Sequence, residues 1–400
     1  MSPSMLSRPP ATLGEPGSGA HPPRRALRGC VAVLAAMGVM ALPVALASPA
    51  QAAAYVPCGN VSALNAAIVQ GNAVSSAFTI ALAPGCTYTL DSAFGGNTGL
   101  TPVTGNIKVA GSRSTIARSS SAATNFRVME VGTGASLSLT GVTLANGHLP
   151  GELGGGVLNN GTLTLNSSTV RDSFGTYGGG IASIGPLLTL NSSAVRNNSA
   201  GFGGGVLLGG LGSKLVANSG TVRDNSASNY AGGVGTGGPD QEIVLRSVTI
   251  KGNTSPGLGG GLAIGAPGNT IDAIGGSITD NTGRIGGGLA VGAPGSQVRL
   301  SGVTIARNEA TSLGAGMYTT GPLRMSGGSL RDNTSAGTGG GLHYDGGDTA
   351  TLVGVTVRGN SATDGGGIYT TSTVTAVGSR FSNNTPNNCA PANTVAGCNN

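Results

Sequence analysis

The apolar and polar positions of this chain form a pattern that repeats along most of its length. Between residues 128 and 385, the repeating unit contains an apolar residue that is followed three positions later by Asn in most units, a short variable link, and then G-G-G (A-G-G and G-A-G in two units) followed by one apolar residue. Successive units are 24 to 28 residues apart, measured between the last glycines of the triplets. These glycines are Gly156, Gly180, Gly205, Gly233, Gly261, Gly288, Gly316, Gly341 and Gly367. The residue after each of them is apolar, namely Val157, Ile181, Val206, Val234, Leu262, Leu289, Met317, Leu342 and Ile368.

A column of asparagines recurs with the same period. Its members are Asn198, Asn225, Asn253, Asn281, Asn308, Asn333, Asn360 and Asn384. Stacked asparagines can hydrogen-bond to the amides one rung above and below, and such a ladder fixes the register of the rungs. The glycines permit a sharp corner and a close approach of neighbouring backbones. We therefore expect a solenoid with an asparagine ladder near one corner.

The pattern inside a unit selects the type of solenoid. In one unit, alternating segments of β type cover 157–159, 163–165 and 168–170. Leucine-rich repeats need an L-x-x-L-x-L frame, calcium-binding rolls need an aspartate every nine residues, and helical repeats need apolar residues at 3.6 spacing. None of these patterns is present. Three strands per turn predict an all-β fold, a right-handed parallel β-helix with three sheets.

The two ends of the chain depart from the repeat. Residues 61–69 are predicted to form a short capping helix with Leu64 and Ile68 on one face and Asn60 or Ser62 as its N-cap. Such a cap would cover strand edges that otherwise promote aggregation. We divide the mature chain into a cap with irregular first coils (53–127), regular coils (128–385) and a C-terminal cap (386–400).

Residues 1–52 are predicted to be a signal peptide. Arg24, Arg25 and Arg28 precede an apolar run over 30–47, and small residues follow it at positions 50 and 52, with cleavage expected after Ala52. The run is also long enough to span a bilayer marginally, so an uncleaved anchor is the alternative. Export by the general or the twin-arginine route stays open. A secreted protein with no membrane insertion after cleavage is the expectation.

Four cysteines remain after residue 52, two near each end. Three pairings are possible, and the local one, Cys58–Cys86 with Cys389–Cys398, is favoured because both pairs would close an open end of the solenoid. Free thiols are the alternative.

Composition and charge exclude several classes of protein. Glycine accounts for 74 of 400 residues and tryptophan is absent, so a globular core of large side chains is excluded. The signal peptide carries four of the 21 basic residues and one of the 15 acidic ones, which leaves a mature net charge of +3. That charge is too small to predict binding to nucleic acid or to a membrane surface.

The repeat carries a family resemblance. The G-G-G-aliphatic and x-x-N elements resemble the repeats of chlamydial polymorphic outer-membrane proteins and, more broadly, bacterial secreted proteins with pectin-lyase-like β-helix repeats. Residues 381–384, F-S-N-N, match the F-x-x-N half of the chlamydial motif, whereas other coils have Val, Ile or Leu in place of Phe. The resemblance covers about 250 residues. It implies a parallel β-helix and a role in adhesion or display at the cell exterior.

Enzymes on this scaffold cleave acidic polysaccharides, but their motifs are missing from this sequence. The N-T-D, D-D, G-H-G and R-I-K elements of galacturonan hydrolases do not occur, and no aspartate cluster of the pectate-lyase kind is found. The sequence also has no metal-ligand cluster, nucleophile triad or phosphate loop, so we predict no cofactor and no metal.

Equal positions on successive coils lie side by side, so columns can reveal a site. The position two residues past the last glycine is occupied by Leu158, Ala182, Leu207, Gly235, Ala263, Ala290, Tyr318, His343 and Tyr369. The last three should form an outward row that can contact sugar rings, with Tyr344 next to it. His343, Asp345 and Asp348 are the candidates for catalysis if the protein is an enzyme. An ordinary exposed β row is the alternative interpretation.

A charged row follows the inward aliphatic residue that lies three positions before the asparagine column. It contains Arg171, Arg196, Arg223, Lys251, Thr279, Ala306, Arg331 and Arg358. The next position contains Asp172, Asn197, Asp224, Gly252, Asp280, Arg307, Asp332 and Gly359. This arrangement indicates either a surface for an anionic polysaccharide, with carboxylates spaced as in an inverting glycosidase, or adjacent charges that neutralise each other.

Together these features predict a secreted, non-catalytic β-helix that binds an extracellular polysaccharide or a cell-surface component. The main alternative is a polysaccharide lyase or glycoside hydrolase with a site that no motif reveals. A purely structural or ice-binding solenoid would need a continuous T-x-T column, and only scattered Thr pairs occur. The sequence does not indicate an oligomeric state.

Overall fold

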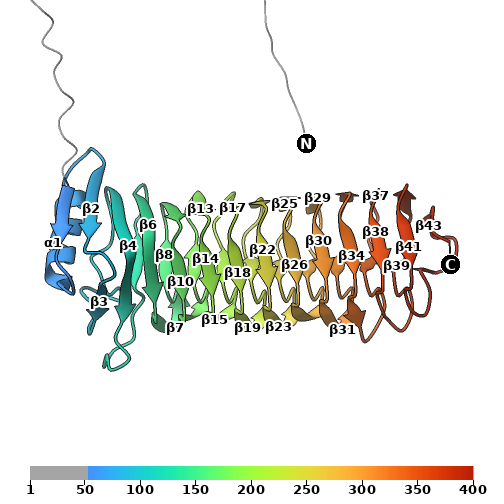
Figure 1. Cartoon of the computed structure of the whole chain (residues 1–400), viewed down its shortest axis with the longest axis horizontal. Helices are drawn as coiled ribbons and strands as arrows, with labels where there is room; N and C mark the ends of the chain where they lie inside the picture. Colours follow the sequence, from blue (N-terminus) through green and yellow to red (C-terminus); the bar gives the residue numbers. More distant parts are fainter. Residues whose placement is uncertain (1–52, 400) are drawn as a thin grey trace, which may run out of the picture. The chain divides into compact units, whose positions relative to one another are not determined.

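A computed structural model describes residues 53–399 of the chain. These residues form a parallel β-solenoid of about 12 turns, whose coils follow one another in sequence order (Figure 1). The strands make three parallel sheets of 24, 8 and 11 strands, here called sheets 1, 2 and 3. The predicted fold class, an all-β three-sheet β-helix, is confirmed. The predicted signal peptide lies outside the described residues.

Each regular coil contributes four strands. In one coil these are β8 (Val157–Asn159), β9 (Thr162–Asn166), β10 (Thr169–Arg171) and β11 (Phe174–Tyr177). They pair in register with β12 (Ile181–Ser183), β13 (Leu187–Asn191), β14 (Ala194–Arg196) and β15 (Ser199–Phe202) of the next coil. Equal positions of successive repeats therefore lie side by side, as expected for the columns of the sequence.

One of the three sheets, sheet 2, is not where the sequence pattern places it. The segments 163–165 and 168–170 both belong to sheet 1, and the longer strand β6 (Ser136–Ala145) pairs with both of them. Ser167 between them has a φ of +45°, which bends the strand without removing it from the sheet. The variable link supplies the missing sheet instead, as β11 and its equivalents.

Sheet 2 escapes sequence analysis because its inward residues are small. They include Gly175, Ala200, Ala227, Ser255, Gly283 and Ala310, all of them buried. Such residues carry no hydrophobic alternation that would reveal a strand. The strands of sheet 2 are β7 (His148–Leu153), β11, β15, β19 (Ser226–Tyr230), β23 (Thr254–Leu258), β27 (Thr282–Ile285), β31 (Glu309–Leu313) and β35 (Thr334–Ser335).

Sheet 3 contains the aliphatic residue that follows each glycine triplet. Its strands are β5 (Met129–Val131), β8, β12, β16 (Val206–Leu208), β20 (Val234–Thr236), β24 (Leu262–Ile264), β28 (Leu289–Val291), β32 (Met317–Thr319), β36 (Leu342–Tyr344), β39 (Ile368–Thr370) and β42 (Cys389–Ala390). The first residue of each of the strands β8 to β39 points into the coil and is fully buried. These aliphatics stack with the inward Leu, Ile and Val of sheet 1 in one continuous core.

The predicted asparagine ladder is present. From Asn198 to Asn384, each side-chain Nδ2 donates to Oδ1 of the next asparagine at 2.9 or 3.0 Å, and all eight residues are buried. Each Nδ2 also donates to a backbone carbonyl of the preceding coil, as Asn281 does to Ile250 at 3.1 Å. The glycine triplets lie against the ladder, where a side chain would not fit: a Cβ on Gly261 would lie 3.0 Å from Cγ of Asn281.

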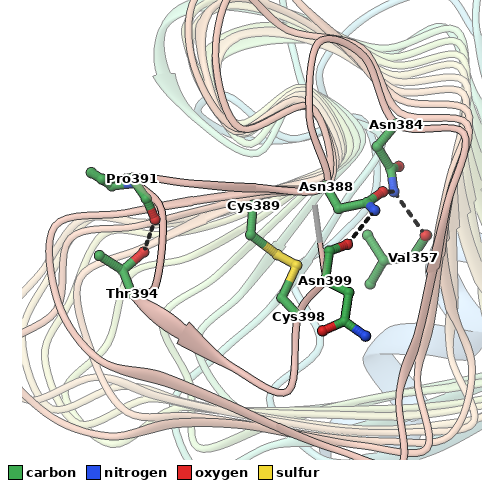
Figure 2. The surroundings of a disulfide bond; sticks show 8 residues. All are labelled: Val357, Asn384, Asn388, Cys389, Pro391, Thr394, Cys398 and Asn399. Atoms are coloured by element: carbon green, nitrogen blue, oxygen red, sulfur yellow. Dashed lines mark hydrogen bonds between the residues drawn. A yellow bond between two sulfur atoms is a disulfide. The ribbon is translucent and has the colours of Figure 1, made fainter.

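The predicted helix and the two predicted disulfides are present at the ends of the solenoid. Helix α1 (Val61–Asn72) buries Leu64 and Ile68, and the side chain of Asn60 caps it by accepting from the backbone N–H of Ala63 at 2.9 Å. The disulfides are Cys58–Cys86 and Cys389–Cys398. At the C-terminal end, Asn384 donates to Asn388, and Asn388 donates in turn to the carbonyl of Asn399 beside the second disulfide (Figure 2). The ladder thus continues into the C-terminal cap.

We expect the two disulfides to stabilise the protein unequally. The closed loops span 28 and 9 residues, and loop-closure entropy predicts losses of roughly 3–4 kcal/mol for Cys58→Ser/Cys86→Ser and roughly 2–3 kcal/mol for Cys389→Ser/Cys398→Ser. Urea unfolding of the oxidised protein and both double variants measures the difference. Equal losses would show that chain entropy does not determine the contribution of these caps.

Candidate functional site

Three rings lie on the outer face of sheet 3 near its C-terminal end. Parallel pairing places Tyr318 of β32 opposite His343 of β36, and His343 opposite Tyr369 of β39. The ring centroids are 5.5 Å apart at 39° for the first pair and 5.0 Å apart at 25° for the second. We call these three residues the ring row. Its members stack on one another along the solenoid, so the histidine ring is enclosed between two phenols.

Both ring nitrogens of His343 face polar groups. Nδ1 lies 2.8 Å from Oγ1 of Thr338, within hydrogen-bond distance. Nε2 lies 2.9 Å from Oδ2 of Asp345, which is ion-pair distance without hydrogen-bond geometry. The side chain is only 5% exposed. These contacts hold the imidazole in place and leave little of it accessible to a ligand.

Asp345 provides the accessible polar edge of the ring row. Its Oδ1 accepts a hydrogen bond from Oγ1 of Thr371 at 3.0 Å, and the carboxylate is partly exposed. Burial raises the pKa of Tyr318, and the nearby negative charge of Asp345 raises it further. Within the described chain, neither Tyr318 nor Tyr369 uses its hydroxyl in a hydrogen bond with another protein group. The two phenol hydroxyls and the Asp345 carboxylate are thus available to a polar ligand.

Tyr344 does not contribute to the surface that the sequence suggested. It is the third residue of β36, so alternation turns its side chain into the coil, where it is fully buried. A Cβ on Gly346 would lie 2.3 Å from the Tyr344 hydroxyl, so the following loop passes directly over it. Burial raises the pKa of Tyr344, and Asp348 adds to this effect. Asp348 itself is exposed in the loop and makes no hydrogen bond or ion pair with another group of residues 53–399.

A second outward row was missed by the sequence analysis. It occupies the position five residues before each outward residue of sheet 3, at the end of the sheet 2 strands, and we call it the corner row. Its members are Tyr177, Phe202, Tyr230, Leu258, Ile285 and Leu313, paired in register from coil to coil. The rings of Tyr177 and Phe202 stack at 5.4 Å. Counting back three residues from each last glycine would have revealed this row.

The charged row forms ion pairs on the surface. Arg171, Arg223 and Arg331 each pair with the aspartate that follows them. Arg307 reaches across to Asp280 with two hydrogen bonds of 2.7 and 3.0 Å and lowers the pKa of that carboxyl group. These contacts agree with the interpretation that adjacent charges neutralise each other. Each of these four carboxylates forms an ion pair with an arginine.

The acidic positions in this row also have a backbone role. Every residue of the column from Asp172 to Gly359 has a positive φ, between +52° and +67°. Asp, Asn and Gly tolerate this left-handed conformation better than other residues. The column is thus explained by a bend that each coil makes after its sheet 1 strands, which the sequence pattern alone did not reveal.

Within 53–399, no helix has the length and apolarity required to cross a bilayer. The same part of the chain has no group of three or more His, Cys, Asp or Glu side chains placed to hold a metal ion.

Comparison with known proteins finds no match among family models, curated proteins or solved structures.

Proposed function

We propose that this protein is an extracellular β-helix that binds polysaccharide, with the ring row as a contact site. The observation that carries the proposal is the ring row itself, because it places two phenols, whose hydroxyls have no protein partner within 53–399, and the Asp345 carboxylate on one outer face. Aromatic rings contact the apolar faces of sugars, while hydroxyl and carboxylate groups bond to their hydroxyls. An attachment role at a cell surface is consistent with the same binding.

The two disulfides and the N-terminal sequence support a location outside the cytosol. Disulfides form and persist in oxidising compartments such as the exterior of the cell, and both caps of this solenoid contain one. The basic, apolar and small-residue order of residues 1–52 agrees with export.

Binding is favoured over catalysis because the side chain of His343 is almost fully buried. A general acid or base must reach the proton that it transfers, whereas this imidazole is 5% exposed and faces partners at both nitrogens. Asp345 and Asp348 remain as carboxylates near the ring row, so release of reducing sugar or unsaturated product in the same assay would establish the enzymatic alternative.

Tyr318→Ala/Tyr369→Ala is expected to weaken polysaccharide binding about tenfold, since each lost aromatic contact is worth about 0.5–1.5 kcal/mol. The measurement is affinity electrophoresis: the exported protein migrates more slowly in a native gel that contains a polysaccharide it binds. The polymers are xylan, galactomannan, soluble β-glucan, polygalacturonate and alginate. Ile274→Ala is the matched control, because it removes an exposed apolar side chain from sheet 1. Equal retention of both variants would remove the ring row from the binding surface.

A further inference from the structure

The corner row continues the surface of the ring row toward the N-terminal end of the solenoid. Leu313 ends β31, and Tyr318 lies on β32 of the same coil, five residues later. Where the outward column of sheet 3 has small residues, as at Ala182, Gly235 and Ala263, the corner row has large ones. At His343 and Tyr369 the corner positions are instead Thr338 and Asp364, while the coil of Tyr318 has a large residue at both positions. One uninterrupted line of large side chains therefore runs from Tyr177 to Tyr369.

Tyr230 shows how the corner row covers sheet 3. Its hydroxyl donates to the backbone carbonyl of Thr236 at 3.0 Å, and burial raises its pKa strongly. A Cβ on Gly235 would lie 2.9 Å from the Tyr230 ring, and a Cβ on Gly265 would lie 2.8 Å from its hydroxyl. The ring thus lies on β20 and reaches toward the next coil, in space that only glycine leaves open.

Phe202 lines two hollows on this surface. The hollow over sheet 2 measures about 490 Å³ and is lined by Phe174 and Phe202 together with hydroxyl and amide groups, among them Ser199, Ser226 and Asn229. The hollow over sheet 3 measures about 240 Å³ and is lined by Tyr177, Phe202, Leu207 and Tyr230 with two glycines. Neither lining contains Asp, Glu, Lys, Arg or His.

The absence of charged side chains from both linings favours an uncharged ligand. A charged group would lose water here without gaining a partner of opposite charge, whereas a neutral sugar needs only ring faces, hydroxyls and amides. The rungs recur at about 4.8 Å, so a ligand along the solenoid meets one large side chain at each coil. A repeating linear molecule fits such a surface better than a single compact one.

We propose that a linear, uncharged polysaccharide lies along the corner row and the ring row, with a separate sugar subsite around Phe202. The proposal rests on the polysaccharide binding proposed above and specifies both the class of polymer and its path. Tyr177 and Phe202 contact one part of the polymer, while Tyr318 and Tyr369 contact another part several coils away.

The test compares Tyr177→Ala/Phe202→Ala with Tyr318→Ala/Tyr369→Ala in gels containing xylan, galactomannan or soluble β-glucan, and polygalacturonate or alginate as acidic polymers. Each double variant should weaken retention by an uncharged polymer about tenfold, and the quadruple variant by more than either. Retention should change little between low and high salt, because no ion pair forms. The single variant Tyr177→Ala, at a ring that is 40% exposed, provides a milder change, and circular dichroism verifies folding.

The outcomes separate the two proposals. If only the Tyr318/Tyr369 variant loses retention, the Phe202 subsite and the extended path are wrong, and the ring row stays as the binding site. Preference for the acidic polymers with strong salt dependence overturns the uncharged class. Absence of retention by every polymer overturns polysaccharide binding and the extended path together.

Discussion

Asn281→Ala is expected to lower the free energy of unfolding by roughly 3–4 kcal/mol, because it leaves buried polar groups without partners. Oδ1 of Asn281 accepts from both the backbone N–H and the side-chain Nδ2 of Asn253. Its Nδ2 donates to Asn308 and to the carbonyl of Ile250. Alanine removes all four bonds in a site with no exposure to solvent, so the N–H of Asn253 and the carbonyl of Ile250 each lose a partner.

The matched control is Asn191→Ala. Asn191 also bonds to asparagines on both neighbouring coils, Asn166 and Asn218, at 2.9 and 2.8 Å. These amides lie on the outer face of sheet 1 and are only half-buried, so water can replace the lost bonds and we expect a loss below about 1 kcal/mol.

Urea midpoints measure both variants, and hydrogen exchange locates the damage. Because a solenoid coil contacts only its neighbours, protection should fall first around residues 250–308 in Asn281→Ala. Similar losses in the two variants would mean that burial does not set the strength of the ladder.

The asparagine and glycine columns could be predicted because each position admits one residue type. The ladder requires a short side chain with both a donor and an acceptor, and the glycine positions packed against it require the absence of a side chain. Such requirements repeat the same letters in every coil, as at Asn253 and Asn281 or at Gly233 and Gly261. The coil length and the core aliphatics followed from the same columns, whereas the two caps followed from the helical pattern of 61–69 and from the cysteines near each end.

The strands of sheet 2 could not be predicted from hydrophobic alternation. Their inward residues are small, as at Gly175 and Ala200, and their outward residues range from Phe174 to Ser199. Only the backbone pairing reveals them. The bends at Ser167 and Asp172 were likewise hidden, because a positive φ leaves a weak preference for residue type rather than a hydrophobic pattern.

The site could be predicted in part. The register of Tyr318, His343 and Tyr369 follows from counting past the glycine triplets, and alternation within β36 already turns Tyr344 inward. The anchoring of His343 could not be foreseen, because Thr338 lies in the variable link, outside the repeated pattern. The corner row was detectable by counting in the other direction, and it changes the expected surface from one short patch to a line across many coils.

Gly261→Ala is expected to destabilise the protein by about 3 kcal/mol, the upper range for a methyl group added to a tightly packed interior. The added Cβ would lie 2.5 Å from the carbonyl oxygen of Gly288 and 3.0 Å from Cγ of Asn281. That carbonyl accepts the backbone hydrogen bond from Leu262 at 2.9 Å. The methyl group therefore pushes on the pairing of two coils and on the asparagine ladder at once, and neither neighbour is a flexible side-chain end.

Gly95→Ala separates this steric effect from the general effect of replacing glycine. A Cβ on Gly95 meets no atom within 4 Å, and its φ is not in the left-handed region, so alanine there should leave the urea midpoint unchanged or slightly raised. A midpoint for Gly261→Ala close to that of the unsubstituted protein would show that adjacent coils can separate to admit a side chain. The glycine triplets would then serve the bend of each chain segment rather than the close stacking of coils.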